Sequence, residues 1–229
     1  MLILALETST ELGSCALWRD GDVLERRCPA GRSHSETLLP LVRELLAEAG
    51  TTVAALDAIA FGAGPGAFTG LRVACGAAQG LAVAAGQPLL PVTSLEALAV
   101  QAGDGEVLAL LDARMGEIYA AAYRVAAGDC RLQGEIRVLA PADLPLPDTA
   151  GWRACGNAPA AYPLLQEKLQ AAGIAILPGL LPTAAAVAAL AAPRLTRGEG
   201  IDAALAAPLY IRDKVAKTVA ERLGEGGRA

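Results

Sequence analysis

The sequence is short of the residues with which proteins most often bind metal ions. It contains one histidine, His34, in 229 residues. A metal site built on two histidines therefore cannot form within one chain, and no cysteine spacing takes its place. A nucleophile–histidine pair could use only His34, for which we expect a polar role at a helix start. The five cysteines, none in a CxxC pair, are Cys15, Cys28, Cys75, Cys130 and Cys155. This usage is typical of the reducing cytosol and argues against a disulfide framework.

Charged and aromatic residues are also scarce. They make up 19% and 3% of the chain, against 54% hydrophobic residues, so we expect a compact fold with cores of Leu, Val, Ile and Ala. The net charge of −5 lacks the basic excess of a free-standing nucleic-acid binder, so any RNA contact would be local or shared with a partner. The start, MLILALETS, has no basic segment, and the alanine-rich stretch 183–192 is too short to span a membrane. We therefore expect a cytoplasmic protein without membrane contact.

Hydrophobic periodicity predicts two successive sets of strands and helices. Three early strands at 2–6, 14–21 and 23–30, joined by tight turns, indicate an antiparallel meander. Helices and strands then alternate up to GDG at 103–105, after which a second mixed set begins. We therefore predict an α/β protein with two lobes, residues 1–102 and 103–229, each with a mixed sheet flanked by helices. The C-terminal tail can pack back on the first lobe.

The stretch GAGPGAFTG at 62–70 places four glycines and a proline between a predicted strand, 56–62, and a predicted helix, 69–85. It lacks the lysine of a phosphate-binding P-loop. It also lacks, about 20 residues further on, the acidic residue that accompanies a dinucleotide-binding G-x-G-x-x-A turn. We interpret it as a constrained turn in which glycine permits a positive φ or a close approach.

Two glycines inside the following helix, Gly76 and Gly80, lie one turn apart on one face. Each costs a helix interior about 1 kcal/mol relative to alanine, which suggests that another backbone comes close there. Tight packing on the chain's own sheet and contact with another subunit are both open explanations.

Two acidic residues stand in matching places, one in each predicted lobe. Glu7 follows the first strand and Asp112 follows the first strand of the second lobe, and each precedes a turn and another strand. A split-lobe nucleotide cleft uses such a pair to hold a metal-bound phosphate, whereas acids at strand ends also commonly face solvent.

Six segments, in order, resemble the TsaB (YeaZ) family through nearly the whole chain. They are LALETSTELGSCAL, HSETLLPLV, GAGPGAFTGLR, PVTSLEALA, DARMGEIYAA and PLYIRDKVA. The resemblance implies a two-lobed actin/Hsp70/sugar-kinase-like (ASKHA) fold. It also implies a non-catalytic scaffold, the dimerisation subunit of the bacterial machinery that makes N6-threonylcarbamoyladenosine. That machinery modifies adenosine 37 of tRNAs that read codons beginning with A.

The resemblance implies partners as well. The catalytic sibling, TsaD, binds a metal through a histidine pair that this chain lacks, and the ATPase TsaE acts through the TsaD complex. The resemblance allows a homodimer when the chain is alone and leaves its resting oligomeric state open, and we expect an indirect or shared tRNA contact. We expect no cofactor in the isolated subunit, with ATP or ADP only at the level of the complex.

Carried over to this sequence, the family's partner interface falls on two helices of the first lobe. The candidates are His34, Leu38, Leu41, Val42, Leu45, Thr69, Arg72, Val73, Gly76, Ala77 and Gly80. A candidate vestigial nucleotide cleft comprises Glu7, Thr8, Ser9, Asp112, Gly156 and Asn157. No catalytic or metal-binding residue is expected. The tail from Arg212 to Arg228, with five basic and three acidic residues, is either a solvated helix or a contact with tRNA or a partner.

Two other functions are alternatives. A small-molecule kinase of the same superfamily would need a catalytic aspartate in the cleft and tight ATP binding. A glycoprotease-like peptidase is disfavoured, because the chain has one histidine and no cluster of metal ligands.

Overall fold

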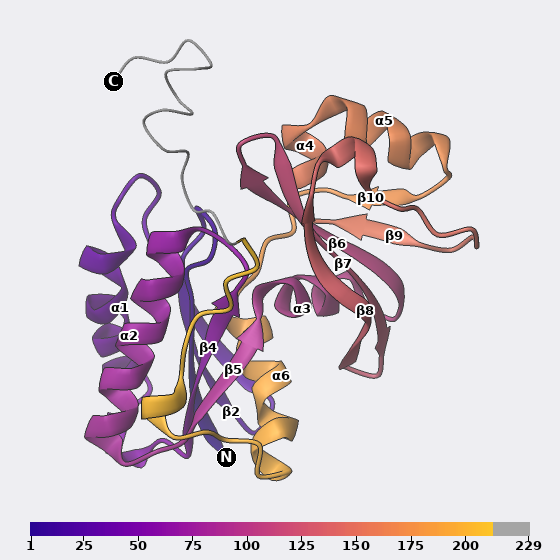
Figure 1. The fold of residues 1–229 in the computed structure, drawn as a ribbon. Helices are drawn as coiled ribbons and strands as arrows, with labels where there is room; N and C mark the ends of the chain where they lie inside the picture. Colours follow the sequence, from indigo (N-terminus) through magenta and orange to yellow (C-terminus); the bar gives the residue numbers. More distant parts are fainter. Residues whose placement is uncertain (213–229) are drawn as a thin grey trace, which may run out of the picture.

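The computed structural model describes residues 1–212 and shows two lobes, each built on a five-stranded mixed sheet (Figure 1). The first sheet, in the order β3-β2-β1-β4-β5, consists of β1 (Leu2–Glu7), β2 (Ser14–Arg19), β3 (Asp22–Arg27), β4 (Ala58–Gly64) and β5 (Leu89–Thr93). The second sheet, in the order β10-β9-β6-β7-β8, consists of β6 (Gly105–Arg114), β7 (Glu117–Ala126), β8 (Asp129–Leu139), β9 (Arg153–Cys155) and β10 (Ala175–Leu177). The predicted two-lobed α/β class with a mixed sheet in each lobe is confirmed.

The two sheets follow one plan. In each, three consecutive strands pair antiparallel, and two later strands add in parallel beside the first of them. β1 and β6 therefore hold the same central place in their sheets. Their carboxyl ends carry Glu7 and Asp112, the two acids that the sequence singled out.

Helices cover both faces of the first sheet. α1 (His34–Glu48) and α2 (Phe68–Ala85) pack on one face, and α6 (Ala184–Thr196) packs on the other (Figure 1). On the second sheet, α3 (Ser94–Ala99) lies on the inner face, and α4 (Ala158–Ala161) and α5 (Pro163–Ala171) lie on the outer face. Single 3₁₀ turns are η1 (Val53–Ala55), η2 (Val100–Ala102), η3 (Pro141–Asp143) and η4 (Ala203–Leu205). The segment expected as the second lobe, 103–229, thus contains a helix, α6, that packs on the first.

Burial follows the two-residue period of a strand. Ile3 and Ala5 of β1 pack toward α6, while Leu4 and Leu6 pack toward α1 and α2, and all four are fully buried. The cluster on the α6 side continues through α3 to the inner face of the second sheet. The two lobes therefore share one apolar core.

The helix α2 is long and apolar enough, by length and composition alone, to cross a membrane. Six of its residues are buried in the fold, however, and the helix packs on β4. Core helices of folded domains commonly pass the same test, so it carries little weight.

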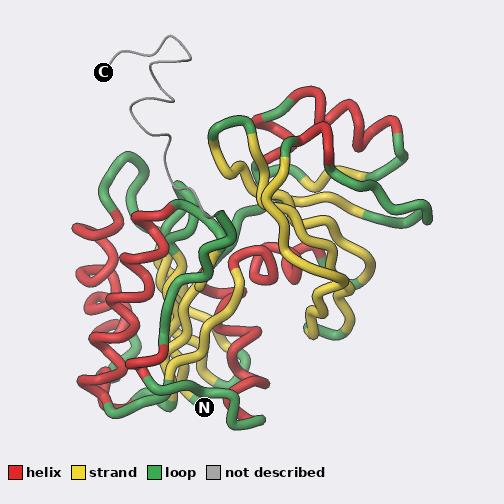
Figure 2. Tube along the Cα trace, in the orientation of Figure 1, coloured by secondary structure: helices red, strands yellow, loops and turns green. Residues whose placement is uncertain are grey.

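Residues 198–212 return across the first lobe as an extended segment, called the strap below (Figures 1 and 2). Leu89 and Ile201 exchange backbone hydrogen bonds of 2.9 and 2.8 Å, and Leu209 N donates to Ala63 O at 2.7 Å. The strap therefore begins beside β5 and passes the glycine-rich turn. Apart from Arg212, the tail predicted at 212–228 lies outside the described residues.

Candidate functional site

Three of the four glycines of GAGPGAFTG pack closely against the segment Glu7–Ser9. A Cβ at Gly62 would lie 2.5 Å from Cδ of Glu7, one at Gly66 would lie 2.6 Å from Cβ of Ser9, and one at Gly70 would overlap the carbonyl oxygen of Thr8. Real Cβ atoms essentially never come within 3.0 Å of such neighbours. The glycines are thus required by close approach of backbone and side chains, as the interpretation of a constrained turn anticipated.

Two hydrogen bonds fix this contact. The Thr8 hydroxyl donates to Gly70 O at 2.7 Å, and Ala67 N donates to Ser9 O at 2.7 Å. The β1–β2 connection and the start of α2 are therefore one packed unit. β4 also extends to Gly64, further than the predicted 56–62, because Gly62 and Gly64 pair with β5.

Glu7 is fully buried in this unit. Its Oε1 accepts from Ser9 N at 2.5 Å, and its Oε2 accepts from Ser94 Oγ at 3.1 Å. Burial raises the pKa of Glu7, although the hydrogen bonds from Ser9 and Ser94 oppose the shift. The carboxylate lies in the interior and does not line the cavities of about 70, 180 and 310 Å³ described below, so it is turned away from them.

Four other residues of the candidate cleft line two cavities near the junction of the lobes. Ser9, Asp112 and Asn157 line a cavity of about 70 Å³. Gly156 and Asn157 line a neighbouring cavity of about 310 Å³, whose walls include Ile176 and Leu181. Thr8 lines neither cavity, because its hydroxyl is bound to α2.

Asp112 is occupied by neighbours of its own lobe. Its Oδ1 accepts from the Tyr162 hydroxyl at 2.8 Å, and its Oδ2 lies 3.0 Å from Nη1 of Arg114. Its backbone N donates to Asn157 Oδ1 at 2.9 Å. Burial and the hydrogen bond to Asp112 raise the pKa of Tyr162 to about 12. Asp112 therefore anchors the end of β6 to the segment around α4, which is a structural use of the carboxylate.

Gly156 is needed for packing. Its φ is +112°, and a Cβ there would lie 2.8 Å from the carbonyl carbon of Leu110. The glycine therefore lets the β9–α4 turn rest on β6, whatever occupies the neighbouring cavity.

The candidate partner face is divided by burial. Leu38, Val42 and Leu45 are buried in the chain's own core, so their assignment to a partner interface is wrong for this structure. They form the stripe of α1 that meets the first sheet. His34 is also turned inward, with Nε2 3.0 Å from Thr10 O.

The outward residues form the α2 face, defined here by Thr69, Arg72, Val73, Gly76, Ala77, Gly80 and Val83. Val73 and Ala77 are half-buried, and the others are exposed, Val83 at 75%. Leu41 of α1 is half-buried beside it. Val83 was not among the sequence candidates, although it continues the helical spacing of Gly76 and Gly80.

Gly76 and Gly80 have open space where a side chain would project. A Cβ at either residue would meet nothing within 4 Å. Tight packing against the chain's own sheet, one of the two open explanations, is therefore wrong. The helix carries two unfavourable glycines on a surface that the described residues leave uncovered.

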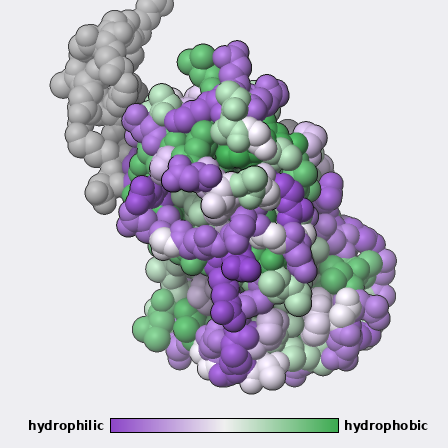
Figure 3. Space-filling view, turned by 90° about the vertical axis from the view of Figure 1, so that its right-hand side faces the viewer, coloured by the Kyte–Doolittle hydropathy of each residue, from purple (hydrophilic) through white to green (hydrophobic). Residues whose placement is uncertain are grey.

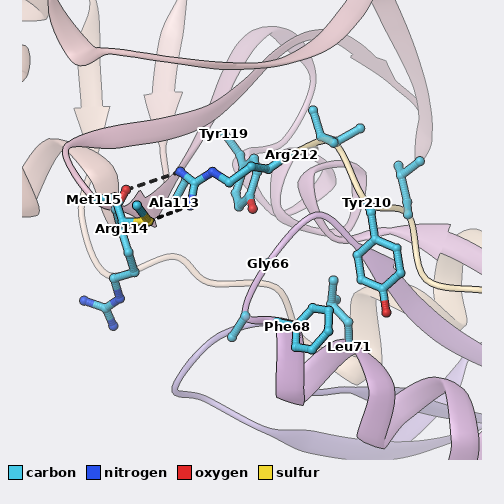
Figure 4. A pocket seen from close by; sticks show the side chains of 12 residues that line it. Gly66, Phe68, Leu71, Ala113, Arg114, Met115, Tyr119, Tyr210 and Arg212 are labelled. Carbon is cyan, nitrogen blue, oxygen red and sulfur yellow. Dashed lines mark hydrogen bonds between the residues drawn. The ribbon is translucent and has the colours of Figure 1, made fainter. Parts of the chain in front are cut away.

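A further cavity, of about 180 Å³, separates α2 and the strap from the β6–β7 turn (Figure 4). Phe68 and Tyr210 form one wall, with ring centroids 5.6 Å apart, and Arg114 and Met115 stand across from them. Arg212 forms an ion pair with Glu117 of β7. The strap thus connects the start of α2 to the second lobe.

Viewed from the side of the second lobe, the surface is mostly hydrophilic, with hydrophobic residues scattered among polar ones (Figure 3). The exposed apolar residues of the second lobe include Leu132 and Leu164. They need no partner to explain them.

Comparisons with known proteins point to one group of relatives. The chain is 37% identical to the tRNA threonylcarbamoyladenosine biosynthesis protein TsaB of Escherichia coli (strain K12), over 94% of this chain and 96% of that protein. It is 44% identical to the Haemophilus influenzae protein of the same name, over 52% of each chain. The model of the TsaD family, described as tRNA N6-adenosine threonylcarbamoyltransferase, matches residues 29–151.

Solved structures agree with these relatives. YeaZ from Pseudomonas aeruginosa superimposes with a TM-score of 0.80 at 40% identity, covering 91% of this chain and 99% of that one. A second Pseudomonas aeruginosa structure, described as an uncharacterized protein with similarity to peptidase YEAZ, gives a TM-score of 0.82 at 40% identity and covers 92% and 99%.

Proposed function

This chain belongs to the TsaB (YeaZ) family, and we propose that it is the non-catalytic subunit that dimerises with TsaD. Its role lies in the biosynthesis of threonylcarbamoyladenosine in tRNA, the pathway for which its relatives are named. In this proposal it activates TsaD, which modifies adenosine 37 of tRNAs that read codons beginning with A.

The observation that carries the proposal is the α2 face. Gly76 and Gly80 cost the helix stability and fill no need of the fold, because open space lies beside both. Small residues on a helix surface allow a second helix to approach closely, so a partner helix explains the glycines. A stable complex would have to bury about 1,000 Å² or more, which extends beyond α2 to exposed parts of α1 such as Leu39.

The site chemistry supports a non-catalytic role. The chain has one histidine, whose ring packs against Gly13 and Thr10 inside the first lobe. Within residues 1–212, no three His, Cys, Asp or Glu side chains gather where they could hold a metal ion. These features also disfavour a peptidase, the activity mentioned for one structural relative.

The further proposals concern the assembly. TsaE acts on this chain only through TsaD, and a homodimer forms when the chain is alone. ATP or ADP binds only at the level of the complex, tRNA contact is indirect or shared, and the complex works in the cytoplasm away from membranes.

The test is a reconstituted modification assay with each subunit omitted in turn. We expect tRNA modification by TsaD, the adenylate-forming enzyme, TsaE and this chain together, and none by this chain without TsaD. Equal modification without this chain would overturn the proposal. A variant of this chain that folds but no longer binds TsaD should give the same level of tRNA modification as omission of the chain.

A small-molecule kinase is the second candidate, and the cavity of about 310 Å³ between the lobes is what favours it. It would require a free catalytic aspartate, whereas Asp112 is bound to Tyr162 and Arg114. Calorimetry with ATP separates the two functions: micromolar binding with phosphoryl transfer by the isolated chain would establish the kinase.

A further inference from the structure

Arg72 is the only charged residue of α2. It is exposed, and at intervals of four residues it shares one side of the helix with Gly76 and Gly80. A guanidinium thus stands at one end of the uncovered small-residue surface. Whatever covers the glycines must also meet this cation.

The guanidinium is held in a fixed orientation. Its Cζ lies 3.9 Å from the centroid of the Phe68 ring, and its Nε donates to the Tyr210 hydroxyl at 3.1 Å. Tyr210 is itself placed by the strap, through the bond from Leu209 N to Ala63 O. Because Nε is used within the chain, the two Nη groups are the donors left for another molecule.

No carboxylate of residues 1–212 lies within 4.0 Å of the Arg72 guanidinium, so none forms an ion pair with it. The two neighbouring arginines differ, since Arg114 pairs with Asp112 and Arg212 pairs with Glu117. In the described part of the chain, Arg72 is therefore an ordered cation without an anion.

A second copy of α2 is a poor match for this cation. α2 contains no Asp or Glu, so a symmetric pairing of two α2 helices would bring two arginines and no carboxylate from either helix. A different chain, with an acidic residue on its docking helix, supplies the missing charge.

We infer that Arg72 is an anchoring contact of the α2 face and that the partner presents an Asp or Glu to it, from a helix that crosses α2 near Gly76 and Gly80. The inference rests on the proposed function, in which this partner is TsaD. A planar guanidinium can bind a carboxylate through both Nη groups, and stacking on Phe68 reduces the conformational freedom lost on binding.

The test measures the Kd between the full-length chain and TsaD of the same organism at low and high salt. We expect Arg72→Glu to weaken binding at least about tenfold and to reduce its dependence on salt. Arg72→Lys keeps the charge but loses the two Nη donors that can bind one carboxylate together, so we expect it to weaken binding to TsaD by about threefold to tenfold. Arg19→Glu is the matched control, because Arg19 is exposed at the end of β2 away from Glu7 and α2, and it should change Kd less than about twofold. Thermal unfolding of each variant verifies the fold.

The outcomes separate this inference from the proposed function. If TsaD bound the wild type and Arg72→Glu with equal Kd, the inference would be wrong and the proposed function would stand. Equal loss in Arg72→Glu and Arg19→Glu would show only a general charge effect and would also overturn it. If Arg72→Glu weakened self-association of the chain but left binding to TsaD unchanged, a second copy would be the occupant instead. Absence of any binding to TsaD would reject both.

Discussion

The carboxyl group of Glu7 occupies the space beside Gly62 into which a side chain at residue 62 would project, since a Cβ there would lie 2.5 Å from the carboxyl carbon of Glu7. Glu7 ends β1, and Gly62 lies in the neighbouring parallel strand β4. The buried carboxylate therefore requires the glycine beside it. The pair explains why a glycine-rich sequence follows a strand without binding phosphate.

We expect Gly62→Ala to destabilise the chain by about 3 kcal/mol, because the new methyl group must displace a buried, hydrogen-bonded carboxylate. The measurement is the free energy of unfolding in urea. In the double variant Glu7→Ala/Gly62→Ala the methyl group meets no carboxylate, so the two changes should cost less together than the sum of the single changes. Strict additivity would show that the two residues do not share this space.

Gly76→Ala and Gly80→Ala should have two effects of opposite sign. Each should raise the free energy of unfolding by about 0.5–1 kcal/mol, because the helix gains propensity and the methyl group meets open space. Together they should weaken binding to TsaD by about tenfold or more, because two methyl groups hold the partner helix away. Unfolding is measured on the isolated chain and Kd on the complex. A double variant that is stabilised and binds TsaD as the wild type does would remove the α2 face from the interface.

The elements of the fold were predictable because their signals are local. The cap of α3 is an example: Thr93 Oγ1 accepts from Glu96 N at 3.2 Å, and a threonine three residues before a glutamate is a local signal for a helix start. At α1 a serine in the same place does not cap the helix. Ser33 precedes the helix, but its hydroxyl bonds Ser35 and leaves the helix uncapped by a side chain.

The orientation of the partner face could not be derived from sequence. The spacing of Leu38, Val42 and Leu45 predicts one apolar side of α1, but the same spacing fits a core face and an interface. Likewise, the spacing of the small residues of α2 does not indicate which of its glycines pack against the rest of the chain. Gly70 meets Thr8, whereas Gly76 meets nothing, and only long-range packing distinguishes them.

The placement of α6 and the strap also depends on contacts between distant parts of the chain. Ala184 N donates to Ser14 Oγ at 2.8 Å, a pairing 170 residues apart for which the sequence gives no sign. The aromatic contact of Phe68 with Tyr210 is equally non-local. The family resemblance therefore placed Arg72 among the interface candidates, but nothing in the sequence indicated that Phe68 and Tyr210 hold its guanidinium.

The stability of the chain should carry a contribution from Glu7 that declines as pH rises. Its pKa in the folded state lies above the ordinary glutamate value of about 4.5, mainly through burial, so the folded state binds a proton more tightly than the unfolded state. Stability therefore falls from about pH 4.5 upward, until Glu7 is ionised in the folded state, and is constant beyond that.

Glu7→Gln removes this titration while keeping an oxygen to accept from Ser9 N. The difference in free energy of unfolding, variant minus wild type, should therefore increase with pH above about 4.5. Urea titrations at intervals between pH 4.5 and 7.5 measure it, and the other carboxylates cancel in the difference. A difference independent of pH would mean that Glu7 titrates alike in both states.

The ion pair between Arg194 of α6 and Glu96 of α3 should matter far more than those on the surface. The Glu96 side chain is 9% exposed, and Arg194 also donates to Pro91 O at 3.1 Å. Removing only the cation leaves a buried carboxylate unpaired, so we expect Arg194→Met to cost about 3 kcal/mol. Arg131→Met, which breaks a pair whose side chains are 82% and 60% exposed, should cost less than about 0.5 kcal/mol.

The pH dependence gives this prediction a second readout. Burial raises the pKa of Glu96 and Arg194 opposes the rise, so the variant Arg194→Met should raise that pKa further. Its stability deficit relative to the wild type should then be smaller near pH 5, where Glu96 can remain protonated, than near pH 8. Glu96→Gln/Arg194→Met should recover part of the loss at pH 8, because a neutral amide is buried at lower cost than a carboxylate. A deficit that is the same at both pH values would mean that Arg194 stabilises the fold by packing and not by its charge.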